Sequence, residues 1–81
     1  MTQPAGPLGL EPLERRSLPD EIRDRLLRLI RNGDLTTGQQ LPAERVLCAE
    51  LTVARTSVRE AIQALVSLGY VERRGNRAYV V

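Results

Sequence analysis

A stripe of apolar residues in the second half of the chain constrains the fold more than any other feature. Its members recur at i, i+3, i+4, i+7 and i+10, the spacing of one face of an α-helix: Val58, Ala61, Ile62, Leu65 and Leu68. Gly69 follows the stripe, and glycine readily takes the left-handed conformation that ends a helix. The pattern predicts an amphipathic helix that covers a hydrophobic core with this face.

The opposite face of this helix is polar. At about 100° per residue, four side chains gather there: Arg55, Thr56, Arg59 and Gln63. Because they oppose the core, they must point to solvent or to a partner. Thr56 and Ser57 also place hydroxyl groups at the helix N-terminus, where free backbone N–H groups can hold a phosphate.

Two further helices precede this one. The first is predicted to begin near Ser17, whose hydroxyl can cap it, and to stop at Asn32 and Gly33. Its apolar residues recur at helical spacing: Ile22, Leu26, Leu29 and Ile30, with Leu27 beside them. The second helix is predicted to open at Pro42 and to run over residues 43 to about 51.

The end of the chain predicts a β-hairpin. Residues 70–73 and 78–81 have strand-forming character, and Arg74, Gly75, Asn76 and Arg77 join them in a turn. Residues 40 and 41 can form a very short strand before the second helix. The order of elements predicts a mainly α fold with a small β-hairpin, the winged helix-turn-helix with three helices plus a wing.

Length and composition limit what the chain can do. Its 81 residues allow one small domain, and without Phe or Trp the core must consist of Leu, Ile, Val and Ala. One Cys and no His argue against a disulfide framework, an ordinary zinc site and His-dependent catalysis. We therefore expect no enzyme, no metal and no cofactor, and Cys48 is interpreted as a small buried residue.

The N-terminal residues and the absence of long apolar runs point to a soluble protein. Residues 1–16 are rich in Pro and Gly without apolar periodicity, which predicts a flexible N-terminal arm before a domain at 17–81. Arg15 and Arg16 are interpreted as part of a solvated tail rather than as contacts with a partner. No apolar run approaches a membrane span and no signal peptide is present, so we expect a cytoplasmic protein.

Positive charge is concentrated near the end of the chain. All 12 cationic residues are Arg, and the formal net charge is only +2. Residues 1–41 balance six Arg with six acids, whereas residues 53–81 hold five Arg and two acids. Arg suits bidentate contacts with guanine and phosphate, although genome composition can equally explain the exclusive use of Arg.

These features fit recognition of duplex DNA. A helix enters the major groove, about 12 Å wide, with a few hydrogen-bonding side chains near its N-terminus, and flanking cations hold phosphates. We assign at least one of Arg55 and Arg59 to a base edge and Arg45, at the start of the second helix, to a phosphate. An ion pair with Glu44 or Glu60 is the alternative role of Arg59.

The wing supplies the second predicted contact with DNA. Arg74, Gly75, Asn76 and Arg77 form its tip, and this thin loop can enter or straddle the minor groove. With the helical residues, the candidate DNA-binding set is Arg45, Arg55, Thr56, Ser57, Arg59, Gln63, Arg74, Gly75, Asn76 and Arg77. Glu44 and Glu60 are expected to orient Arg side chains or to cap helices.

Two linked motifs make a resemblance to a known family specific. The chain contains G-x-L-x-x-G-x-x-L-P-x-E-R from Gly33 to Arg45 and R-x-x-V-R-E-A from Arg55 to Ala61. Over about residues 18 to 81 it resembles the N-terminal DNA-binding domain of the GntR family of bacterial transcription regulators. The sequences of both motifs further resemble those of the FadR subfamily, which adds a helical effector domain.

The resemblance implies a function and partners. It implies sequence-specific binding of a double-stranded DNA operator, with contacts from Arg45, Arg55, Thr56, Arg59 and Gly75, and repression or activation of transcription. It also implies a homodimer on a palindromic operator, and a small-molecule effector that acts only through a C-terminal domain. Because this chain stops at the second wing strand, we expect an isolated DNA-binding domain of a longer regulator.

Four positions depart from the family pattern. Ala43 replaces a helix-capping Ser, and Thr52 occupies the usual Gly of the turn, where a β-branched residue at positive φ is strained. Val46 replaces a commonly charged residue, and Ala78 stands near the second Gly of the wing.

The alternative function is a winged-helix protein–protein interaction module, since fold alone does not decide function.

Overall fold

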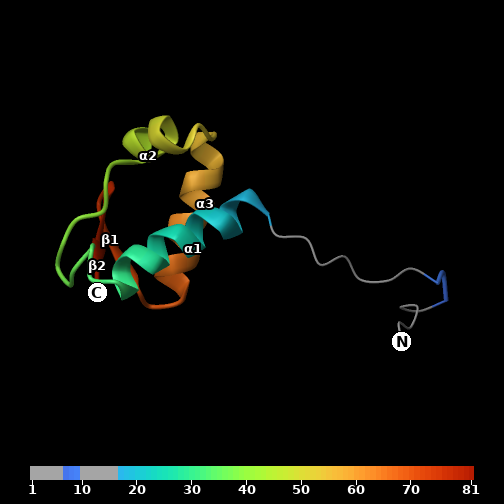
Figure 1. Cartoon of the computed structure of the whole chain (residues 1–81), viewed down its shortest axis with the longest axis horizontal. Coiled ribbons are helices and arrows are strands. Elements are labelled where there is room, and N and C mark those ends of the chain that lie inside the picture. Colours follow the sequence, from blue (N-terminus) through green and yellow to red (C-terminus); the bar gives the residue numbers. More distant parts are fainter. Residues whose placement is uncertain (1–6, 10–16) are drawn as a thin grey trace.

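Three helices and one hairpin build the domain in the computed structural model, which describes residues 7–9 and 17–81 (Figure 1). The elements are α1 (Leu18–Arg31), α2 (Glu44–Leu51), α3 (Arg55–Ser67), β1 (Val71–Arg74) and β2 (Arg77–Val80). This order confirms the predicted winged helix-turn-helix. The predicted N-terminal arm, with Arg15 and Arg16, lies outside the described residues except for 7–9.

The start and end of α1 follow the sequence closely. The Ser17 hydroxyl oxygen accepts a hydrogen bond from the Asp20 backbone N–H at 3.2 Å, and the Ser17 backbone N–H donates to the Asp20 carboxylate at 3.3 Å. This reciprocal pair is a capping box, which satisfies two backbone donors at the helix start. Gly33, with φ of 84°, turns the chain away just after the helix.

The turn between α2 and α3 is tight and carries a non-glycine residue in a left-handed conformation. Thr52 has φ of 55° and ψ of 53°, as predicted from its place in the turn. A β-branched residue there costs about 1 to 3 kcal/mol. Ala43 and Ala54, which precede α2 and α3, make no side-chain capping bond, so both helix starts keep uncapped backbone N–H groups.

The hairpin closes with a two-residue turn. Val71 pairs with Val80 and Arg73 with Ala78, and one further pair, Arg74 with Arg77, precedes Gly75–Asn76. The strands therefore approach the turn by one residue more than predicted. Gly75 has φ of 65°, whereas Thr52 is the only non-glycine residue with positive φ among those described, so the turn has the pattern of type II′.

The segment before α2 adds to the free edge of β2. Gln40 forms an isolated β-bridge with Tyr79, and the Leu41 N–H donates to the Ala78 carbonyl at 2.8 Å. The Val80 N–H in turn donates to the Gln39 carbonyl at 2.9 Å. The short strand predicted at residues 40 and 41 is thus a single bridge. It joins the wing to the residues that lead into α2.

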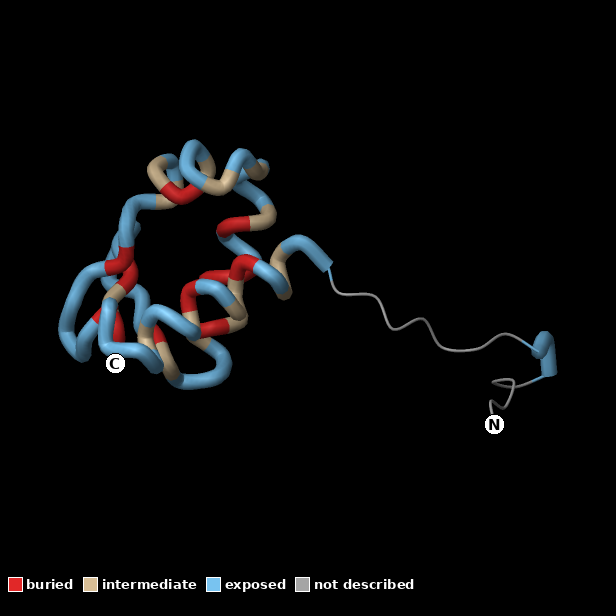
Figure 2. The backbone as a smooth tube through the Cα atoms, viewed as in Figure 1, coloured by how far each residue is buried: buried red, intermediate tan, exposed pale blue. Residues whose placement is uncertain are grey.

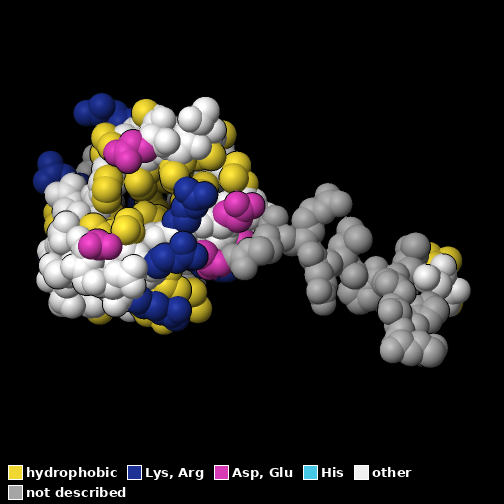
Figure 3. All heavy atoms as spheres, viewed as in Figure 1, with side chains coloured by type: hydrophobic (Ala, Val, Ile, Leu, Met, Phe, Trp, Pro, Cys, Tyr) yellow, Lys and Arg dark blue, Asp and Glu magenta, His cyan; other side chains and the backbone are white. Residues whose placement is uncertain are grey.

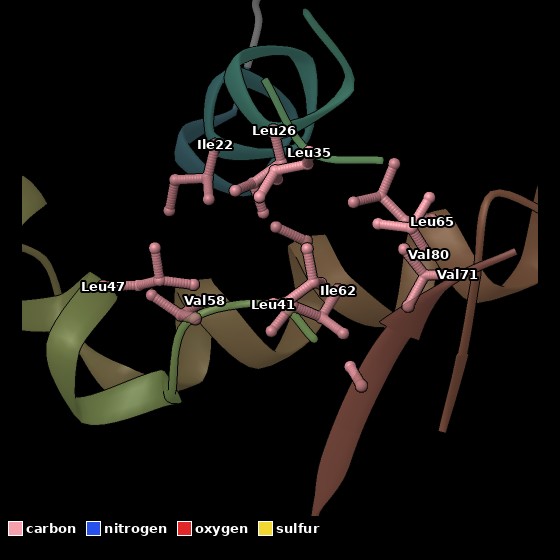
Figure 4. Close-up of a cluster of buried hydrophobic side chains, with 12 residues drawn as sticks. Ile22, Leu26, Leu35, Leu41, Leu47, Val58, Ile62, Leu65, Val71 and Val80 are labelled. Atoms are coloured by element: carbon pink, nitrogen blue, oxygen red, sulfur yellow. The ribbon is translucent and has the colours of Figure 1, made fainter. Parts of the chain in front are cut away.

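The core lies where α1, α3 and the hairpin face one another (Figure 2). Figure 4 shows how the labelled core side chains, which come from all three helices and both strands, point toward one another. The core residues are all aliphatic: Ile22, Leu26, Leu35, Leu41, Leu47, Val58, Ala61, Ile62, Leu65, Val71, Ala78 and Val80. Among the residues described, no polar or charged side chain is buried. α3 contributes four of these residues, so the core fixes which face of α3 is left outside.

Two residues of the predicted apolar stripes are not part of the core. Leu68 is 58% exposed because it follows the last helical residue of α3, where the chain already turns toward Gly69. Leu29 is 39% exposed on α1, while Leu27 and Ile30 pack against the core instead. Cys48 is half-buried and also packs against the core. Among the described helices, none is long and apolar enough to cross a membrane.

Candidate nucleic-acid interface

A groove with a volume of about 420 Å³ lies between the starts of α2 and α3 and the tip of the hairpin. Five guanidinium groups from four elements line it: Arg45, Arg55, Arg59, Arg73 and Arg77. Leu41, Ile62 and Ala78 also line the groove, and all three are buried core residues. Core residues thus form the apolar part of the groove lining, and positively charged side chains surround them.

α3 presents its arginines to the groove because its other face is fully used by the core. Val58 and Leu65 are completely buried, so the residues roughly opposite them must face outward. Arg55 and Arg59 lie one turn apart, are exposed and line the groove. Gln63 continues this row one turn further along α3 and is exposed.

The hydroxyl residues at the start of α3 lie beside the groove. Thr56 is exposed and Ser57 is half-buried, and neither is among the lining residues. Arg45, the second residue of α2, is exposed and does line the groove. The starts of α2 and α3, each with unsatisfied N–H groups, therefore meet at the same depression, which favours an anion there.

The two neighbouring arginines at the end of β1 have opposite surroundings. Arg73 is paired in register with buried Ala78 and lines the groove. Arg74 donates from Nε to a Glu72 carboxylate oxygen at 2.6 Å, and its guanidinium lies 4.6 Å from the centre of the Tyr79 ring. Glu72 and Tyr79 are cross-strand partners, so Arg74 is held on the outer face of the hairpin.

The residues at the tip of the wing also differ in whether they line the groove. Asn76 and Arg77 line the groove, whereas Gly75 does not, although all three are exposed. The structure therefore brings together Arg45, Arg55, Arg59, Asn76 and Arg77 from the predicted set. It leaves Thr56, Ser57, Gln63, Arg74 and Gly75 around the groove rather than in its lining.

One carboxylate lies among these cations. Glu44, the first residue of α2, accepts a hydrogen bond at Oε1 from Arg59 Nε at 3.1 Å, and its Oε2 lies 3.6 Å from Arg73 Nη2. The alternative partner predicted for Arg59 is therefore present, as Glu44 rather than Glu60. The Arg59 side chain nevertheless stays 63% exposed, so its remaining donors face solvent.

Arg73 is a groove residue that the predicted DNA-binding set omits. The sequence does contain a signal for it, since Arg73 alternates with Val71 along a strand and shares the core-facing side. Because Arg73 lies near the end of β1, its long side chain extends past the core toward the start of α2. Alternation of this kind distinguishes Arg73 from Arg74, which charge alone cannot do.

Comparison with known proteins identifies the family. The family model described as "Bacterial regulatory proteins, gntR family" matches residues 18–81. The transcriptional repressor NanR of Klebsiella aerogenes is 44% identical over 74 residues, which cover 90% of this chain and 28% of NanR. The chain spans between 26% and 28% of the length of the first curated relatives that it matches.

Solved structures agree with this match. YtrA from Sulfolobus acidocaldarius, a GntR-family transcription factor, superposes with a TM-score of 0.77 at 30% identity and covers 83% of this chain and 71% of YtrA. The DNA-binding domain of AraR in complex with operator ORX1 gives a TM-score of 0.79 at 26% identity, covering 88% of this chain and 89% of that one. The match of sequence over residues 18–81 and the shared fold show that this chain belongs to the GntR family of bacterial regulatory proteins.

Proposed function

We propose that this domain binds operator DNA sequence-specifically, with α3 in the major groove and the wing at the minor groove. The observation that carries the proposal is the convergence of five arginines on one groove beside the starts of α2 and α3. Duplex DNA presents base edges between two rows of phosphates, so it matches a helix face flanked by cations. The AraR DNA-binding domain, which shares this fold, has been solved in complex with an operator, and this supports operator binding by the present domain.

The groove suggests a role for each element. Arg55 and Arg59 reach base edges from the exposed face of α3, and a bidentate contact with guanine discriminates by about 1 to 3 kcal/mol. Arg45 holds a phosphate from the start of α2, and Thr56 and Ser57 do so at the start of α3. Gln63 contacts DNA one turn beyond Arg59.

The wing has two sets of candidate contacts. Asn76 and Arg77 approach DNA from the groove side of the tip, and Gly75 lets the backbone come close because it has no side chain. Arg74 reaches the adjacent phosphates after leaving Glu72, since both of these side chains are exposed.

We further propose that the regulator containing this domain acts as a homodimer on a palindromic operator and represses or activates transcription in the cytoplasm. Two copies of a helix-turn-helix bind half-sites about one helical turn apart, so a palindrome reflects the two-fold symmetry of the protein. A small-molecule effector would act through a further domain, because the groove of this domain is lined by arginines and suits a polyanion.

Protein–protein interaction, the alternative function, is less well supported at this groove. An interface with a partner protein is built around buried apolar or aromatic anchors. The large exposed hydrophobic residues of the described chain all lie away from the groove lining: Leu8, Leu18, Leu29, Leu68 and Val81. The groove therefore offers charge rather than apolar anchors.

Selection of duplexes from a random pool tests the proposed function. We expect an enriched sequence, and we expect the enriched duplex to bind at least about tenfold more tightly than a scrambled duplex. Raising salt from 50 to 200 mM should weaken binding roughly a hundredfold if about four phosphates are contacted. No enrichment, together with salt-independent binding, would contradict the proposal.

A further inference from the structure

Glu44 is unusual because, within the described part of the chain, it is the only acidic residue in the lining of an arginine-rich groove. A carboxylate there repels phosphate, so its presence weakens the attraction of the groove for any DNA. Its two oxygens contact two arginines from different elements, Arg59 on α3 and Arg73 on β1. One side chain at the start of α2 thus links all three parts of the predicted DNA-binding surface.

The contact with Arg59 involves a particular edge of the guanidinium. Glu44 Oε1 accepts from Arg59 Nε at 3.1 Å, which occupies the side edge of the group. The two terminal nitrogens remain available on a side chain that is 63% exposed. Guanine O6 and N7 are read by a pair of parallel donors, so a guanidinium fixed through Nε presents its end to a base edge.

The contact with Arg73 involves the wing. Arg73 is paired with buried Ala78, so the position of its side chain follows that of the hairpin. Glu44 Oε2 lies 3.6 Å from Arg73 Nη2, and this pair joins β1 to the first residue of α2. One carboxylate therefore contacts both the wing and the recognition helix, which also pack against each other through the core. Glu44 is only 21% exposed, so both contacts are partly shielded from water.

We propose that Glu44 is a specificity-determining residue, which positions Arg59 to read one base and lowers affinity for non-cognate DNA. This inference rests on the proposed function. Specificity is a difference between two affinities. The orientation of Arg59 strengthens binding of the cognate duplex only and so contributes to this difference, whereas the repulsion by the carboxylate weakens binding of every duplex equally and sets the overall affinity. Removal of the carboxylate should therefore raise affinity for random DNA while reducing discrimination.

The experiment separates the effect of the Glu44 charge from that of the carboxylate position with two variants of Glu44 and one control variant. Glu44→Gln removes the charge, and Glu44→Asp keeps the charge but shortens the side chain by one methylene. Glu50→Gln is the matched control, because Glu50 is an exposed acid of the same helix and lies outside the groove lining. The probes are the duplex enriched by the unmodified chain, all its single-base variants, and a scrambled duplex of equal length. Circular dichroism and thermal melting check that each variant is folded.

We expect Glu44→Gln to bind the scrambled duplex about threefold more tightly and to lose about tenfold discrimination at one base position. Glu44→Asp should leave affinity for the scrambled duplex unchanged and lose discrimination at the same position. Glu50→Gln should change all duplexes by one common factor.

Two results would overturn the inference. If Glu44→Gln strengthens binding of all duplexes by one factor, Glu44 acts only through its charge. If Glu44→Asp discriminates as well as the unmodified chain, the position of the carboxylate is unimportant. Failure of the unmodified chain to enrich any sequence, together with salt-independent binding, would instead contradict the proposed function, so the two failures can be told apart.

Discussion

Two surfaces of the domain are rich in arginine, and they differ in how the charges are arranged. α1 carries four arginines along one helix: Arg23, Arg25, Arg28 and Arg31. Figure 3 shows one face of the molecule, on which several basic side chains lie in a row with acidic ones beside them. The groove gathers five arginines from four elements around one depression, and Glu44 is the only acid among the described residues that line it. Similar numbers of arginine therefore produce different electrostatic fields.

The local partners explain the difference. On α1, Arg23 contacts the carboxylates of two residues of its own helix, Asp20 at 3.3 Å and Asp24 at 3.0 Å, whereas in the groove Glu44 contacts arginines of two other elements, Arg59 and Arg73. In the groove, the cations come from segments far apart in sequence, and low-dielectric walls focus their field. Convergence of elements, rather than the local count of arginines, distinguishes a binding surface from a solvated face.

The largest predicted effect separates these two surfaces directly. Arg55→Ala combined with Arg59→Ala should weaken binding of the enriched duplex by about a hundredfold or more, because two base contacts are lost. Arg25→Ala combined with Arg28→Ala removes the same charge from α1 and should weaken binding less than about threefold, by screened long-range attraction alone. Titration of labelled duplex at 100 mM salt measures both. Equal losses in the two variants would show that net charge, not the groove, drives binding.

Much of the fold could be predicted because local and tertiary preferences agree. Ser17 caps α1, and the face of α3 that includes Val58 and Leu65 is completely buried. Leu29 and Leu68 were placed incorrectly because helical spacing gives the direction of a side chain but not how far the neighbouring elements extend. Each lies at the edge of the core, where neighbouring elements do not bury the side chain. The position of this edge depends on how α1, α2 and α3 pack.

The candidate site was less predictable than the fold. Spacing along α3 indicates that Arg55 and Arg59 share an exposed face, and the structure has both in the groove lining. Glu44 was one of two partners predicted for Arg59, but its second contact, with Arg73, joins residues separated by 29 positions, and no local pattern encodes such a distance. The different surroundings of Arg73 and Arg74 depend on strand register.

A smaller effect should come from the turn that holds α2 against α3, and so sets the spacing of the groove arginines. Thr52→Gly removes a β-branched residue from φ of 55° and should stabilise the domain by about 1 kcal/mol, after the entropy cost of glycine. Thr37→Gly is the control, since Thr37 is an exposed turn residue without positive φ and should lose about 0.5 kcal/mol. Urea unfolding measures both free energies. A loss of stability in Thr52→Gly would mean that threonine is not strained in this turn.

The smallest effect is expected on α1. Arg23→Ala removes both carboxylate contacts, yet the free energy of unfolding should fall by less than about 0.5 kcal/mol because ion pairs near the surface contribute little. High salt should reduce even this difference, since it screens the pairs. Urea unfolding at low and high salt measures the change, and duplex titration of the same variant should show no loss of sequence preference. A loss of preference would add α1 to the DNA-binding surface and remove the contrast between the two arginine-rich regions, because a solvated face cannot distinguish one base from another.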